Sequence, residues 1–218
     1  MVSHTENLVR TRSDKRAERT RKKLELAALE VFTEYGLDAA TIEDITQRAD
    51  LGKGTFYRHF KDKYEVATNL VGFAIDELVL RLRKNEKQPT TLTDVLGHLL
   101  DAHYHFFVEE NEKFMLLFQG RLLVKMERRI SEQMEQPYNR YLEEMEHMLS
   151  PFVGEKIDPM KIRRLAGAVA GFVFGFFSFA MIGMEFGEVE SSIQPLRQSF
   201  VRSLSSFLGH LPEHKGSL

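Results

Sequence analysis

The sequence predicts an all-α protein with a small N-terminal bundle and a larger C-terminal one. Over most of its 218 residues, apolar residues recur at spacings of three and four, the period of a helix that buries one face. No stretch of useful length alternates apolar with polar residues, as a half-buried strand would. A polar connector, KNEKQPTT over residues 84–91, marks the seam between the two bundles.

Composition favours a soluble cytoplasmic protein. Hydrophobic residues make up 43% of the chain and charged residues 28%, which is ordinary for a globular protein. The chain has no cysteine, so disulfides, zinc fingers and thiol nucleophiles are excluded. Residues 1–23 contain no apolar core of a secretory signal, and we therefore expect a cytoplasmic location.

Positive charge is concentrated at the front of the chain. The whole chain carries a net charge of −2, but residues 1–24 carry +5 and residues 48–63 carry +3. Such asymmetry is typical of a protein with an anionic partner, although a solvated basic tail is the simpler alternative. We expect residues 1–17 to form a flexible basic arm.

The N-terminal bundle is predicted to contain three helices, and a long fourth helix follows them. The first has an apolar stripe and ends at Gly36. Thr41 and Asp44 form a capping box that opens a short helix over 42–49. After the break at Asp50–Gly52, a second short helix covers 53–60, and Asp62 with Glu65 caps a long helix that runs to about residue 84. The stripe of the first helix consists of Leu24, Ala27, Ala28, Val31, Phe32 and Tyr35.

The two short helices predict a helix-turn-helix over about residues 41–60, which offers its second helix to the DNA major groove. At 100° per residue, Phe56 and Phe60 form a narrow apolar pair that docks on the bundle, and the rest of the helix faces outward. Lys63 starts the following helix, where free backbone N–H groups already favour phosphate. A plain helical hairpin with a basic face is the alternative. The residues expected to face DNA are Lys53, Gly54, Thr55, Tyr57, Arg58, His59 and Lys63.

Residues 21–66, RKKLELAALEVFTEYGLDAATIEDITQRADLGKGTFYRHFKDKYEV, resemble the N-terminal domain of the TetR family of transcriptional regulators. The resemblance covers about residues 18–78 and is most specific over GKGTFYRHFKDK, residues 52–63. It implies a homodimer that binds a palindromic operator, most often as a repressor, and a domain over 79–218 that binds a small molecule and then releases the DNA. The positions that it implies as phosphate or base contacts are Thr41, Lys53, Gly54, Thr55, Tyr57, His59 and Lys63. Arg58 stands where the family often has an aromatic residue, so a guanine contact and a phosphate contact both remain open.

In the C-terminal bundle, helices are expected near 93–110, 112–118, 120–135 and 137–149, followed by a loop over 150–159. Residues 165–184 carry no charge and are long enough to cross a bilayer, so a membrane-anchored, non-enzymatic protein is the alternative. We expect burial instead, because this is the sole such segment and the amphipathic helix near 193–211 needs a partner to pack on.

The resemblance implies that the last two helices form the dimer interface. The candidates are a face of small residues and an apolar stripe: Gly167, Gly171, Gly175, Leu196, Phe200, Leu204 and Phe207.

A surplus of aromatic residues and methionine predicts a lipophilic effector, with Arg121 facing an anionic group; a packed core is the alternative. The candidate contacts are Tyr104, Phe107, Phe114, Met115, Phe118, Arg121, Phe172, Phe176 and Phe179.

No catalytic residue, cofactor or metal is expected. The sequence has no glycine-rich phosphate loop, nucleophile elbow or HExxH motif. Asp101, His105 and Glu109 share a helical stripe that a metal would need, but three such groups on one stripe are usually a solvated face.

Overall fold

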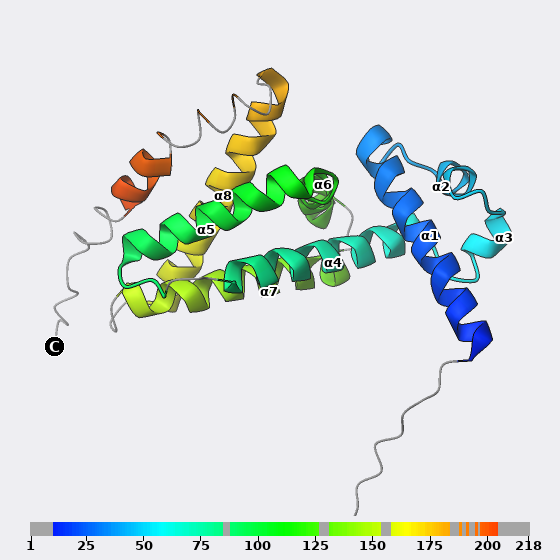
Figure 1. The fold of residues 1–218 in the computed structure, drawn as a ribbon, viewed down its shortest axis with the longest axis horizontal. Coiled ribbons are helices and arrows are strands. Elements are labelled where there is room, and N and C mark those ends of the chain that lie inside the picture. The colour runs from blue at the N-terminus through cyan, green and yellow to red at the C-terminus, as the bar shows by residue number, and fades with distance from the viewer. Residues whose placement is uncertain are drawn as a thin grey trace, which may run out of the picture. The chain divides into compact units, whose positions relative to one another are not determined.

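The computed structural model describes residues 11–84, 88–126, 131–153, 158–183, 188, 191, 195 and 197–204. No strand occurs in these residues, which confirms the all-α class. The chain divides into two compact units, residues 1–70 and residues 71–218. The division falls within α4 (Lys63–Arg83), the helix that follows the small N-terminal helices in Figure 1.

The first unit is a three-helix bundle followed by the start of α4. It contains α1 (Arg12–Tyr35), α2 (Ile42–Arg48) and α3 (Lys53–Phe56). The predicted capping box of α2 is confirmed, since the Thr41 hydroxyl accepts from the Asp44 N–H and the Asp44 carboxylate accepts from Thr41 N–H. The core that these helices share is made of Leu24, Ala28, Phe32, Ile45, Phe56 and Phe60.

The first helix begins earlier than the sequence suggested. Residues 12–17, expected in a flexible arm, are the first turns of α1, and residues 1–10 lie outside the described residues. The reason is a second capping box, in which Thr11 and Asp14 satisfy each other's backbone N–H groups. The helix therefore has a defined start well before its first buried residue, Leu24.

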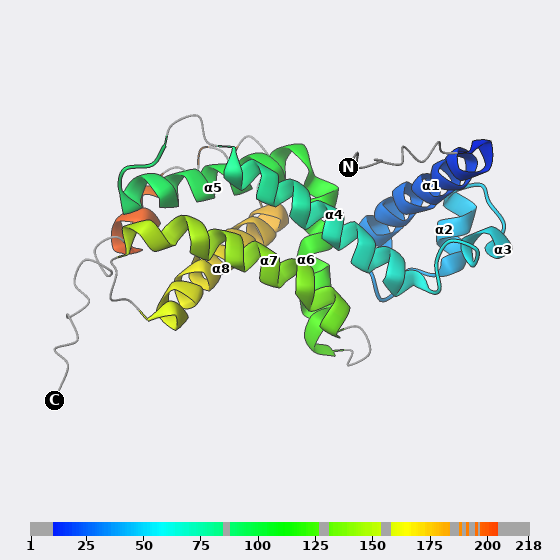
Figure 2. The ribbon, with the colours of Figure 1, turned by 90° about the horizontal axis from the view of Figure 1, so that it is seen from below.

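The second unit contains residues 71–83 of α4 together with α5 (Leu92–Glu109), α6 (Asn111–Met126), α7 (Ser131–Leu149), the short 3-10 helix η1 (Ser150–Phe152) and α8 (Pro159–Gly183). Figure 2 shows α8 crossing the other helices. At the centre, the rings of Phe107 and Phe177 stack 4.3 Å apart and those of Phe114 and Phe174 stack 5.0 Å apart. These aromatic pairs join α5 and α6 to α8.

Two breaks predicted in this unit are wrong. α6 continues through Gly120, and α7 begins at Ser131 and continues through Pro137. A Cβ on Gly120 would lie 2.8 Å from the Tyr138 hydroxyl and 3.0 Å from Val71 Cγ2, so this glycine permits a close approach of helices instead of ending one. Pro137 is buried, and its packing offsets the backbone hydrogen bond that it removes.

A buried histidine lies between α5 and α7. The His103 Nδ1–H donates to the Leu99 carbonyl at 2.5 Å, and Nε2 accepts from the Tyr141 hydroxyl at 2.6 Å, which assigns the neutral tautomer. Burial lowers the pKa of His103 to about 4 and raises the pKa of the Tyr141 phenol.

This histidine predicts a loss of stability in mild acid. The folded pKa lies below the ordinary value of 6.5, so stability is complete above pH 6.5 and falls as the unfolded chain alone takes up the proton. By pH 4.5 the cost is about 2–3 kcal/mol. Urea unfolding at pH 7 and pH 4.5 measures it, with His103→Gln as the variant that lacks the titrating ring. If both proteins lose the same free energy of unfolding between these pH values, His103 is not the cause.

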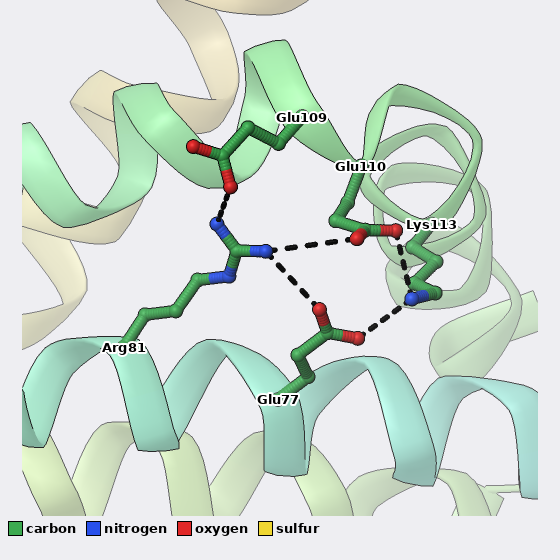
Figure 3. A network of polar contacts seen from close by, with 5 residues as sticks. All are labelled: Glu77, Arg81, Glu109, Glu110 and Lys113. Atoms are coloured by element: carbon green, nitrogen blue, oxygen red, sulfur yellow. Dashed lines mark hydrogen bonds and ion pairs between the residues drawn. The ribbon is translucent and has the colours of Figure 1, made fainter.

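An ion-pair network fixes α4 to α5 and α6 within the second unit (Figure 3). Arg81 pairs with Glu77, Glu109 and Glu110, and Lys113 pairs with Glu77 and Glu110 at 2.6 and 2.7 Å. Burial works to raise the pKa of Glu77, but hydrogen bonds from Lys113 and Arg81 outweigh it and the pKa falls. The end of α4 therefore lies in a charged clamp made by the end of α5 and the first turn of α6.

One side of α8 is packed and the other is open. The window Pro159–Ala180 is long and apolar enough to cross a bilayer, with a mean hydropathy of 1.4. Its inner side, however, packs on α5 and α7 through buried residues: Leu165, Ala166, Val169, Val173, Phe174 and Phe177. This side of α8 is therefore part of the core of the second unit.

Candidate functional site

The outer face of α3 and the turn that follows it is polar and exposed. Phe56 and Phe60, the two residues predicted to dock, are buried, and Phe60 N–H donates to the Phe56 carbonyl at 2.9 Å. Between them, Tyr57 is 59% exposed and Arg58 is exposed. The predicted orientation of this segment is therefore the observed one, although regular α3 ends at Phe56 and turns continue it.

Three side chains on this face, those of Thr55, Arg58 and His59, carry hydrogen-bonding groups. The Arg58 Nη2 donates to the Thr55 hydroxyl at 3.0 Å, which holds the guanidinium across the face while leaving most of its donors available. Burial, followed by the charges of Arg21 and Arg58, lowers the pKa of His59. At neutral pH this imidazole is uncharged and acts as a hydrogen-bonding group rather than as a cation.

The two flanking lysines differ in role. Lys53 forms an exposed ion pair with Glu43 at 2.8 Å, a contact that a phosphate can replace at little cost. Lys63 donates to the carbonyls of Asp38 and Ala40 at 2.7 and 2.8 Å. Lys63 therefore ties the start of α4 to the segment before α2, which the sequence did not indicate.

Arg21 of α1 supports the end of α3 and was also missed. Its guanidinium lies 4.5 Å from the centre of the Phe60 ring, donates to the His59 carbonyl at 3.5 Å and pairs with Glu25. The carbonyl lies 38 residues away along the chain, so no local pattern could have revealed it.

Neither steric contact nor backbone conformation within the described residues requires glycine at position 54. A Cβ at this exposed position would meet no atom within 4 Å, and the backbone is in an ordinary helical conformation. Glycine within a helix costs about 1 kcal/mol relative to alanine. A close approach of the backbone to an external partner is a reason that offsets this cost.

A cavity of about 360 Å³ lies between α6, α7 and α8, within the second unit. Its wall is apolar at Leu142, Ala170 and Phe174, and Arg121 lies at its edge, 5.7 Å from the Phe174 ring centre. The volume is in the range of small-molecule sites. The lining also includes Glu135, Tyr138, Asn139, Tyr141, Gly167 and Gly171.

Most residues predicted to contact a ligand lie elsewhere. Arg121 lines this cavity, whereas Phe107 and Phe114 are buried in the packed core and Phe179 is 76% exposed. Met115 and Phe118 are half-buried on α6. Tyr104, Phe172 and Phe176 line a void of about 10 Å³, which has room for little more than one water molecule. Among these predicted contacts, Phe107 and Phe114 are core residues, as the alternative interpretation expected.

The open side of α8 carries the glycines predicted for a dimer interface. Gly167 and Gly171 are exposed, Gly175 is half-buried, and a Cβ on any of them would meet no atom within 4 Å. Two large apolar side chains on the same side, Met160 and Phe179, are 54% and 76% exposed. Phe200 stacks on Phe172 of its own chain at 3.9 Å and Leu204 is half-buried, whereas Leu196 and Phe207 lie outside the described residues.

Two of the three residues considered as ligands of a metal form ion pairs. Asp101 pairs with Arg197 at 2.7 Å, and Glu109 pairs with Arg81. No group of three potential ligands occurs among the residues that the structure describes.

Comparison with known proteins bears on the first unit above all. Residues 26–69, which include α2, α3 and the start of α4, match the family described as bacterial regulatory proteins, tetR family. This segment of the chain is thus similar to the TetR family. TetR-family transcriptional regulators are DNA-binding proteins and not enzymes, and the matched segment contains the whole exposed face of α3.

Curated relatives of this chain are transcriptional regulators. It is 32% identical to an uncharacterized HTH-type transcriptional regulator, YvdT, of Bacillus subtilis. The alignment extends over 128 residues, which are 57% of this chain and 63% of YvdT. It is 31% identical over 100 residues to the transcriptional activator FasR of Mycolicibacterium smegmatis, which covers 46% of each chain. The chain thus spans less than two thirds of the length of these two relatives.

Solved TetR-like structures share the fold. FadR from Bacillus subtilis, in complex with stearoyl-CoA, has a TM-score of 0.68 and 18% identity over 85% of this chain and 97% of that one. PfmR from Thermus thermophilus has a TM-score of 0.60 and 22% identity over 83% and 97%. At these identities the likeness concerns the fold alone.

Proposed function

We propose that the protein is a cytoplasmic, homodimeric transcriptional repressor that binds a palindromic operator through α3 and releases it when an acidic lipophilic molecule occupies the α6–α8 cavity. The observation that carries the proposal is the exposed cationic face of α3 within the TetR-family segment. Repression is favoured because the negative regulator IcaR of Staphylococcus aureus aligns with 83% of the chain, at 22% identity, whereas the activator FasR aligns with 46%.

The DNA-binding part of the proposal is supported by the roles that the α3 face offers. Thr55, Tyr57 and Arg58 supply hydroxyl and guanidinium donors for base edges, and Lys53 supplies a phosphate contact. Thr41 caps the exposed start of α2, where a phosphate meets free N–H groups.

Gly54→Ala tests whether the backbone of α3 approaches DNA closely. Because the new methyl group meets no atom of the protein, we expect the free protein to become more stable by about 0.5–1 kcal/mol. Operator affinity should fall at least tenfold, since the methyl group holds the helix away from the groove. Thermal unfolding and fluorescence anisotropy with operator DNA measure the two effects. A variant that binds the operator like the parent protein would remove the argument drawn from Gly54.

The effector proposal rests on the chemistry of the cavity wall. Leu142, Ala170 and Phe174 suit a hydrocarbon, and the Arg121 guanidinium suits a carboxylate or phosphate. The FadR structure, with stearoyl-CoA bound, is an example of this fold with an acyl ligand. Release would act through α4. The charged clamp fixes the end of α4 to α6, the helix that carries Arg121, and α3 immediately precedes the start of α4 along the chain.

Arg121→Gln tests the acidic group of the effector, with decanoate and decan-1-ol as matched probes. We expect the parent protein to prefer decanoate, and the variant to lose about tenfold or more in affinity for decanoate while binding the alcohol unchanged. Titration calorimetry measures both. Saturating operator must weaken decanoate binding by the factor by which decanoate weakens operator binding. Equal affinities with and without operator would exclude decanoate as an effector, and equal binding of both probes by the parent protein would exclude the role of Arg121.

The dimer proposal is supported by the open side of α8. Glycines within a helix cost stability, and a Cβ on Gly167, Gly171 or Gly175 would meet no atom of the chain. The exposed Phe179 adds apolar surface that a second copy would cover. A two-fold dimer would present two α3 helices to two half-sites. The membrane-anchored alternative is disfavoured by the buried inner side of α8, and solubility without detergent tests it.

A further inference from the structure

The first half of α1 extends beyond the core of its own unit. The helix has 24 residues, but its first buried residue is Leu24, so residues 12–23 continue for about 18 Å at 1.5 Å per residue. Its start is fixed by the Thr11–Asp14 capping box. The capping box therefore specifies a helix over this extension.

The extension carries a one-sided stripe of positive charge. At 100° per residue, six cations fall within an arc of about 120° that contains no acidic residue of the extension. Asp14 and Arg21 point to the opposite side, and Glu18 lies about 40° beyond the edge of the arc, next to Lys22. We call these six exposed residues the basic stripe: Arg12, Lys15, Arg16, Arg19, Lys22 and Lys23.

The basic stripe ends where the core of the unit begins. On the same side of α1, the next charged residues are Glu30 and Glu34, and both pair with Arg48. The stripe thus ends before the first buried residue of α1, Leu24. Along this side of α1, the charged residues are positive before Leu24, the first buried residue, and acidic after it.

Like charges crowd the basic stripe in the free protein. Arg12 and Arg16, Lys15 and Arg19, and Arg19 and Lys23 are like charges four residues apart, an arrangement that destabilises a helix. Cations near a helix N-terminus also oppose the macrodipole. A polyanion that binds the stripe would offset both costs.

The direction of the basic stripe separates it from the α3 surface. Arg21, which contacts the His59 carbonyl and the Phe60 ring at the end of α3, lies about 160° around α1 from the centre of the stripe. The stripe therefore points away from α3 and extends beyond it. Phosphates that meet the stripe are consequently not those that α3 contacts.

We propose that the basic stripe binds the phosphate backbone of duplex DNA flanking the operator, independently of its sequence. The inference rests on the proposed function for the existence of an operator. The stripe spans about 16 Å, over which B-DNA carries about ten phosphates. Contact there would lengthen the bound duplex and steepen the dependence of affinity on salt without changing which bases are read.

The test compares a short and a long duplex. The short one contains the operator alone, and the long one adds twelve base pairs of unrelated sequence on each side. We expect the parent protein to bind the long duplex at least tenfold more tightly at 0.1 M salt. A variant with Lys15, Arg16, Arg19 and Lys22 all changed to Gln should bind both duplexes equally, and its salt slope on the long duplex should be shallower by at least two.

Two control proteins isolate the charge of the basic stripe. The variant K15R/R16K/R19K/K22R keeps the charges and should keep the preference for the long duplex. Lys84→Gln with Lys161→Gln removes exposed cations of the second unit and should also keep it. The fourfold Gln variant should melt at the same or a higher temperature, because it relieves the repulsion along α1.

Each outcome decides the proposal. If the fourfold Gln variant keeps the preference for the long duplex, or binds every duplex like the parent, the stripe does not bind DNA and an acidic protein becomes the better partner. An equal loss on both duplexes would place the stripe on the operator itself and overturn the flanking contact. If the parent protein selects no operator, the proposed function fails separately, and the inference still requires the Gln variant to bind long unrelated duplexes more weakly.

Discussion

Changing Thr55, Tyr57 and Arg58 together to alanine is expected to lower operator affinity at least about 1,000-fold. Each residue that contacts a base edge contributes about 1–3 kcal/mol of discrimination, and a dimer uses each of them twice. The fold should remain, because these side chains are exposed or half-buried while Phe56 and Phe60 hold the segment in place.

Unrelated duplex DNA is the control for this triple variant. Its binding depends on phosphate contacts, and Lys53 and the basic stripe are unchanged, so affinity for unrelated DNA should fall much less than operator affinity. Fluorescence anisotropy on both duplexes gives the ratio, and far-UV circular dichroism checks the helices. An operator affinity that survives all three substitutions would show that α3 is not the surface that reads DNA.

Phe179→Asp is expected to convert the protein into a monomer. In a two-fold interface the substitution introduces two carboxylates, and like charges brought together across an interface cost several kcal/mol. The dimer dissociation constant should rise at least about 1,000-fold. Phe179 lines neither cavity described for the second unit, so the effector site is left intact.

Phe73→Asp on α4 is the matched control, because Phe73 is similarly exposed, at 60%, but belongs to α4 and not to α8. This variant should stay dimeric in sedimentation equilibrium at micromolar concentration. The Phe179 variant should also lose operator affinity at least 100-fold, since a monomer binds one half-site. A parent protein that sediments as a monomer would contradict the proposed dimer, as would a Phe179 variant that stays dimeric.

The first unit could be predicted from its sequence because its signals are local. The cap at Thr41 and the docking of Phe56 and Phe60 follow from spacings within a few residues. The start of α1 could have been predicted as well, since Thr11 and Asp14 have the spacing of a capping box. The tether from Lys63 could not, because its acceptor carbonyls are 23 and 25 residues away.

The second unit was harder to predict because α8 has no polar face to fix its rotation. The rings of this helix that were predicted to contact a ligand are those of Phe172, Phe176 and Phe179, but the rings that enter the core are those of Phe174 and Phe177. Gly120 and Pro137 misled in a similar way. Each is a common helix breaker, and only tertiary packing explains why the helix continues through it.

Selection of bound sequences from a random duplex library tests the central claim most directly. If two α3 helices of a dimer read DNA, the parent protein will enrich an inverted repeat of two half-sites, and the Thr55/Tyr57/Arg58 triple variant will not. The account is contradicted if the parent protein enriches no sequence above unrelated DNA, or if the triple variant enriches the same repeat.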